Sequence, residues 1–122
     1  MTSKSMAKLR DAASRRQNGC CFYCGVRMLT ASACGRRAER ALVCTAEHLV
    51  PRSAGGADAA DNIVAACWFC NTRRHRPRLP LPVLAYREHV QKRVEIGRWH
   101  SAIRGRRATA GRPDGAFSAL SP

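Results

Sequence analysis

The hydrophobic positions of this chain follow a helical period near both ends and form short unbroken runs in the middle. Residues 1–17 carry apolar side chains on one side of a segment that is either a short basic helix or a mobile arm. Residues 83–97 repeat the period, so one face of a helix is expected to pack against a core. These apolar positions are Met6, Leu9 and Ala13 in the first segment, and Val83, Tyr86, Val90 and Val94 in the second.

Two short runs between these segments predict strands. Residues 41–50 (ALVCTAEHLV) and 63–67 (IVAAC) are apolar and rich in β-branched side chains. Residues 51–62 contain a proline, two glycines and two aspartates, so they predict a loop that joins the strands. Another helix is expected to begin near residue 69 or 70 and to end at the prolines that start at Pro77.

This order of elements predicts a small α+β domain over residues 18–97, preceded by the basic segment of residues 1–17. The pattern assigns no regular structure to residues 26–40. Residues 98–122 are rich in glycine, alanine, arginine and proline, and we expect a basic, mostly disordered tail there.

Charge narrows the choice of partners. The 122 residues include 22 Lys and Arg against 8 Asp and Glu, a formal net charge of +14. Such an excess favours polyanions, with nucleic acid the first candidate and an acidic membrane surface the second. No apolar run approaches the roughly 18–20 residues of a membrane-spanning helix, and the N-terminal stretch lacks the apolar core of a secretory signal. We therefore expect a cytoplasmic protein.

Seven cysteines suggest either disulfides or a metal site. The odd number, the lack of an export signal and two Cys-x-x-Cys pairs favour metal in a reducing compartment. Four thiolates are the usual ligands of a closed structural zinc site, whose binding free energy would also stabilise the fold. The predicted ligands are Cys21, Cys24, Cys67 and Cys70. Cys20 adjoins the first pair but fits the spacing less well, and Cys34 and Cys44 are expected to be small buried side chains or free thiols.

A carboxylate and a histidine, Glu47 and His48, end the first predicted strand. Neighbouring residues of a strand point to opposite faces, so both can serve one site only if the chain bends there. Alone, the pair is equally well explained as a surface carboxylate beside a half-buried histidine. However, thirteen residues separate His48 from Asn62, and eight more separate Asn62 from Asn71, which comes directly after the last cysteine of the second pair.

The motifs CFYCG, EHLVPRSAGG, DNIVAAC and CWFCNTRR together resemble the HNH nuclease family, also called ββα-metal or His-Me finger nucleases. The similarity covers about residues 20–76 and is greatest to members that two Cys-x-x-Cys pairs staple together. It implies a ββα-metal domain and a metal-dependent endonuclease that hydrolyses phosphodiester bonds in DNA.

The resemblance also implies roles for single residues. His48 matches the general base, and Asn62 matches the residue that ties the loop together and helps to orient the histidine. Glu47 and Asn71 match ligands of a catalytic Mg²⁺ or Mn²⁺, although many members have aspartate at the position of Glu47. His75 follows Asn71 by one helical turn and matches a position that contacts metal or phosphate in some members; a solvated or phosphate-touching side chain is the alternative. A backbone carbonyl of the loop is expected to accept the second ring N–H of His48.

Basic residues bracket this site in the sequence and are candidates for contacts with the nucleic acid. Each is also compatible with an ordinary solvated side chain, but in a chain this basic they favour phosphate contact as a group. Phosphate contacts carry little sequence information, so we expect weak specificity and strong dependence on salt. These residues are Arg52, Arg73, Arg74, His75 and Arg76, with Arg78 nearby.

Two hypotheses in which the protein has no catalytic activity remain open. A zinc-stapled module that binds nucleic acid would need every feature except Glu47, His48, Asn62 and Asn71. A small accessory protein with a degenerate nuclease fold is a third, weaker reading. The presence of His48 argues for the nuclease, because a binding module has no need of a base.

Overall fold

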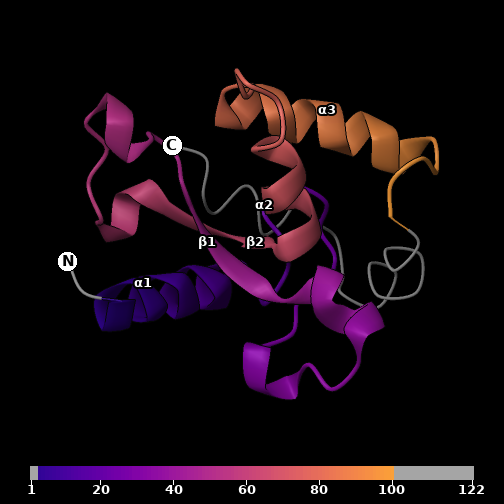
Figure 1. Ribbon diagram of the computed structural model, residues 1–122, viewed down its shortest axis with the longest axis horizontal. Helices are drawn as coiled ribbons and strands as arrows, with labels where there is room; N and C mark the ends of the chain where they lie inside the picture. The colour runs from indigo at the N-terminus through magenta and orange to yellow at the C-terminus, as the bar shows by residue number, and fades with distance from the viewer. Residues whose placement is uncertain (1–2, 101–122) are drawn as a thin grey trace.

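The computed structural model describes residues 3–100, and residues 101–122, on which most of the predicted tail falls, lie outside the described range (Figure 1). The helices and strands are α1 (Ser3–Arg16), β1 (Cys44–His48), β2 (Ile63–Cys67), α2 (Trp68–Arg74) and α3 (Val83–Glu95), with short 3₁₀ turns in the loops. Within the described range, no helix has the length and apolar character needed to cross a membrane.

β1 and β2 form an antiparallel pair in which Glu47 lies opposite Val64 and His48 opposite Ile63. The pair is buried on both faces, with α1 on one side and α2 and α3 on the other (Figure 1). This double burial explains why every residue of β2 is apolar and buried. β2 spans the run predicted for residues 63–67. β1 ends at His48, as predicted, but begins only at Cys44, because residues 37–42 form a 3₁₀ helix.

The segment of residues 1–17 is a helix docked on the sheet. Ala13 is fully buried and packs with Ile63 and Ala65, and Met6 and Leu9 lie against the same cluster, as their spacing predicts. The buried Gln17 side chain holds the end of the helix to β2. Its amide nitrogen donates to the Ala65 carbonyl and its amide oxygen accepts from the Ala65 N–H, both at 2.8 Å.

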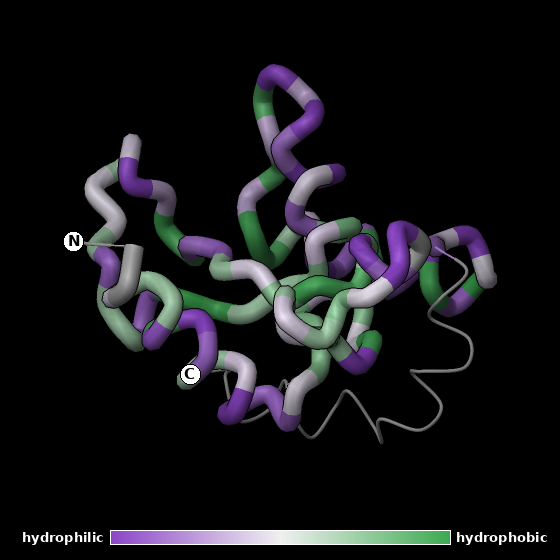
Figure 2. Tube along the Cα trace, turned by 60° about the horizontal axis from the view of Figure 1, so that its bottom comes forward, coloured by the Kyte–Doolittle hydropathy of each residue, from purple (hydrophilic) through white to green (hydrophobic). Residues whose placement is uncertain are grey.

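The main core lies on the other face of the sheet. Val83, Tyr86 and Val90 of α3 are buried there and Val94 packs against them, which confirms the helical period of residues 83–97. Figure 2 shows the hydrophobic segments concentrated along the centre of the fold, with hydrophilic residues at the outer turns. The rings of Tyr23 and Tyr86 meet edge to face in this core, with centroids 4.8 Å apart.

Gly56 marks the closest backbone approach in the loop between the strands. A Cβ atom added at Gly56 would lie 1.7 Å from the Val50 carbonyl oxygen, so the backbone would have to move. We expect Gly56→Ala to lower the free energy of unfolding by about 3 kcal/mol, because of overpacking against a rigid group. Urea unfolding measures the change. The control is Gly35→Ala, where no atom lies within 4 Å of the added carbon, and an equal loss in both variants would contradict the expectation.

Candidate active site and metal centre

Four buried cysteines meet where the first Cys-x-x-Cys turn packs against the start of α2. The sulfur atoms of Cys21, Cys24, Cys67 and Cys70 all lie within 4.8 Å of one another, and those of Cys24 and Cys67 are 3.8 Å apart. A tetrahedral zinc ion with Zn–S bonds of about 2.3 Å separates its sulfurs by about 3.8 Å. The cluster therefore has the spacing and the donor type of a closed structural zinc site.

N–H groups surround the sulfur atoms of this cluster. The backbone N–H groups of Tyr23 and Cys67 donate to Cys21 Sγ at 3.3 Å, and that of Cys70 donates to Cys67 Sγ at 3.4 Å. The Trp99 indole N–H donates to Cys70 Sγ at 3.3 Å. Such donors stabilise the negative charge of thiolates that bind a metal. Trp99 lies at the start of the segment for which a mostly disordered tail is expected, and it packs on the cluster.

The other three cysteines lie outside the cluster, and none of the seven forms a disulfide. Cys20 is buried but its sulfur lies 3.6 Å from the Asn18 carbonyl oxygen. Cys44 is half-buried beside α1, and burial raises the pKa of its thiol to about 11. Cys34 is also only partly exposed. Cys44 is thus a protonated, small apolar side chain at neutral pH.

Glu47 is a buried carboxylate, only 5 % exposed, on the face of β1 that meets α2. Its Oε2 atom accepts from the Tyr23 hydroxyl at 3.0 Å and from Arg74 Nη1 at 3.3 Å, and its Oε1 atom lies 3.2 Å from His75 Nε2. Burial, followed by the charge of Glu47, raises the pKa of Tyr23 well above its usual range, so the phenol is a fixed donor. Sequence reasoning missed Tyr23, because nothing in its spacing links it to Glu47.

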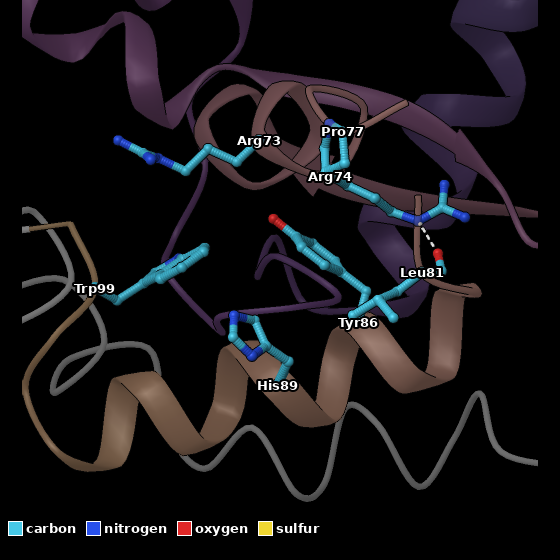
Figure 3. Close-up of a pocket in the computed structure, with 7 residues that line it drawn as sticks. All are labelled: Arg73, Arg74, Pro77, Leu81, Tyr86, His89 and Trp99. Atoms are coloured by element: carbon cyan, nitrogen blue, oxygen red, sulfur yellow. Dashed lines mark hydrogen bonds between the residues drawn. The ribbon is translucent and has the colours of Figure 1, made fainter. Parts of the chain in front are cut away.

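Arg74 differs from the exposed, phosphate-binding arginine that its sequence position predicts. It is 6 % exposed and spans from Glu47 to the Leu81 carbonyl, to which its Nε–H donates at 3.0 Å (Figure 3). It also borders a pocket of about 260 Å³ between α2, α3 and Trp99. The guanidinium of its neighbour Arg73 lies instead 4.2 Å from the centroid of the Phe69 ring, at the surface. Arg74 therefore pairs with Glu47, and the exposed positions are left to Arg73 and Arg76.

Asn71 faces the outer edge of β1 from α2. Its Nδ2 group donates to Thr45 Oγ1 at 2.9 Å and to the Ala46 carbonyl at 3.2 Å. His75, one turn further along, reaches Glu47. α2 thus brings His75 to Glu47, while the Asn71 side chain binds β1 at Thr45 and Ala46.

His48 leaves β1 on the opposite face from Glu47, because the strand stays regularly paired up to Ile63. Its Nε2 atom lies 2.7 Å from Oδ1 of Asp58 in the following loop. Arg52 binds the same carboxylate, with Nη2 at 2.9 Å from Oδ2. These two donors, Arg52 first, lower the pKa of Asp58 to about 2. The predicted backbone acceptor for His48 is therefore wrong: the acceptor is a carboxylate, and it was missed because an aspartate in a glycine-rich loop also reads as an ordinary turn residue.

Asn62 closes the loop that carries Asp58. Its side-chain oxygen accepts from the Val50 N–H at 2.8 Å, and its Nδ2 group donates at 2.9 Å to the carbonyls of Val50 and Ala57. The backbone N–H of Leu49 donates to the Asn62 carbonyl, which continues the strand pairing by one step. One amide side chain thus ties the end of β1 to the start of β2.

Two antiparallel strands followed directly by a helix, with a four-cysteine cluster at their junction, make a ββα-metal fold. Residues 32–77 match the family model described as HNH endonuclease, and this segment contains both strands and α2. The first cysteine pair precedes the matched segment, and the fold brings it to the second pair. No curated protein and no solved structure matches the chain.

Proposed function

We propose that the protein is a metal-dependent endonuclease that hydrolyses phosphodiester bonds in DNA. The observation that supports this most is the short contact between His48 and Asp58 at the end of β1, within the segment that matches the HNH endonuclease model. A histidine whose second ring nitrogen is held by a carboxylate has the arrangement of a general base. A module that only binds nucleic acid has no use for it.

The residues at the junction of β1 and α2 suit a hard divalent cation. Since Tyr23 and Arg74 bind Oε2 of Glu47, a cation would meet its Oε1 atom, on the side of His75. Asn71 would add an amide oxygen, and both are ligand types that Mg²⁺ and Mn²⁺ prefer over the thiolates that suit zinc. His75 is 50 % exposed, and its Nε2 atom lies 3.2 Å from Glu47 Oε1, so it would add a third donor. When bound, the cation would stabilise charge on the phosphate and on the leaving oxygen.

The bend that would turn His48 and Glu47 to one face does not occur, because β1 is regularly paired at both residues. The proposal therefore requires the bound DNA to reach both side chains around the end of the strand. A phosphate lying across the edge of β1 would be approached by the imidazole from one face and by the Glu47 side from the other. The exposed Arg73 and Arg76 at the end of α2, in a chain of net charge +14, suit the flanking phosphates. Contacts of this kind give strong salt dependence and little sequence specificity.

Supercoiled plasmid distinguishes the nuclease from the binding module. Incubated with the purified protein and Mg²⁺ or Mn²⁺, it is expected to become nicked, since one cut relaxes the whole circle. A chelator should stop the reaction, and excess Mg²⁺ should restore it while circular dichroism shows an intact fold. Retarded plasmid without nicks, at every metal concentration, would favour the non-catalytic nucleic-acid-binding module.

A further inference from the structure

Three side chains, those of His48, Asp58 and Arg52, contact one another at the end of β1 and in the loop that follows. His48 Nε2 meets Oδ1 of Asp58 at 2.7 Å, and Arg52 grips the same carboxylate with Nε at 3.0 Å from Oδ1 and Nη2 at 2.9 Å from Oδ2. The Asp58 side chain is 11 % exposed, whereas that of Arg52 is 61 % exposed. The carboxylate is therefore the least exposed of the three groups, between a His48 side chain that is 18 % exposed and the exposed Arg52.

The backbone around Asp58 is held by contacts that do not involve its side chain. Asn62 fixes the Ala57 carbonyl, one residue before Asp58, and also both backbone groups of Val50. Gly56 lies so close to Val50 that no side chain fits there. The position of the carboxylate is thus set by the loop, and Arg52 sets its rotation. Pre-organisation of this kind is what a group that orients a base requires.

We propose that Asp58 is a positioning residue for His48, and that it selects the nitrogen of the imidazole that acts as base. An ionised carboxylate only accepts, so Nε2 carries the hydrogen and Nδ1 keeps the lone pair. This inference rests on the proposed nuclease function. It gives Asp58 a part in catalysis, whereas an aspartate that only paired with Arg52 would merely stabilise the loop. The depressed pKa of Asp58 keeps the carboxylate ionised throughout the neutral range.

The proton balance of the step follows from this tautomer. The O–H bond of the attacking water breaks as the Nδ1–H bond forms, the water oxygen bonds to phosphorus, and the P–O3′ bond breaks. The products are a 5′-phosphate and a 3′-hydroxyl whose oxygen is protonated by solvent. The imidazolium formed on the way lies against the Asp58 carboxylate until it returns its proton to solvent. Asp58 stabilises that charge without itself being protonated.

Asp58→Asn tests the proposal, with Asp61→Asn as the matched control. Both aspartates lie in the same loop, but Asp61 is exposed and makes no contact with His48 among the hydrogen bonds of the described residues. We expect Asp58→Asn to lower kcat for plasmid nicking about 10- to 100-fold, with the half-saturating DNA concentration unchanged. Asp61→Asn should nick at the parent rate, and Asp58→Glu should recover part of the activity.

The ¹⁵N chemical shifts of the His48 ring provide a readout independent of cleavage. The parent should show the Nε2–H tautomer, and Asp58→Asn a mixture of both tautomers. Parent-like shifts in that variant, with or without a loss of rate, would overturn the proposal and leave Asp58 as a structural residue of the loop. If the parent nicks no plasmid, the proposed function fails, and the shifts still decide whether Asp58 sets the tautomer.

Discussion

Replacing His48 by alanine is expected to lower the rate of metal-dependent plasmid nicking by about 10³-fold, with DNA binding and fold retained. A positioned general base contributes about 10²- to 10⁴-fold, and no other imidazole contacts Asp58 among the described residues. The His48 side chain is 18 % exposed at the end of a strand, so its removal leaves no large cavity in the core. The loss should therefore appear in the chemical step.

Nicking of supercoiled plasmid, read beside a gel-shift assay for binding, measures this effect. The matched control is His89→Ala, because His89 is an exposed histidine on α3 that does not contact the loop of Asp58. That variant should cut at close to the parent rate. A His48→Ala protein that nicks as fast as the parent would show that the base lies elsewhere, or that the activity comes from a contaminant.

Replacing Cys67 by serine is expected to unfold the domain. The Cys67 sulfur is fully buried in the four-cysteine cluster and accepts the Cys70 N–H at the start of α2. Structural zinc sites contribute roughly 10–16 kcal/mol of binding free energy in small domains, as much as the whole stability of many proteins. A domain with so short a sheet and so small a core is not expected to fold without that contribution.

Metal analysis after dialysis and far-ultraviolet circular dichroism measure this outcome. The parent should retain about one zinc per chain, and Cys67→Ser should retain none and lose its helical signal. Cys34→Ser is the control, because Cys34 lies outside the cluster and only partly buried. If the Cys67→Ser protein lacks zinc and still melts at the parent temperature, the metal is not needed for the stability of the fold.

The elements of the domain followed from local patterns that report burial directly. IVAAC is apolar at every position because both faces of β2 are covered, and Val83, Tyr86 and Val90 recur at the helical period because one face of α3 meets the core. The cysteine pairs were found by spacing, since two ligands on one tight turn are a local property. The 3₁₀ helix of residues 37–42 escaped prediction, because its polar residues have no period.

The side chains that contact Glu47 and His48 could not be predicted from local sequence patterns. Arg73 and Arg74 are adjacent and chemically identical, yet one faces solvent and the other is buried against Glu47, because only the packing of α2 on β1 decides which side chain points inward. Asp58 reaches His48 through a loop whose path depends on the contacts of Asn62 and Gly56.

Sequence alone located the two cysteine pairs and most of the strand and helix segments, because spacing and burial leave a trace along the chain. His48 was singled out only by the resemblance of its motif to the HNH family. Tertiary structure alone decided what each charged group is paired with. Whether a carboxylate faces water, an arginine or an imidazole depends on residues distant in sequence. A buried charge needs a specific partner because burying it unpaired is costly, but the sequence around the charge does not show which partner that is.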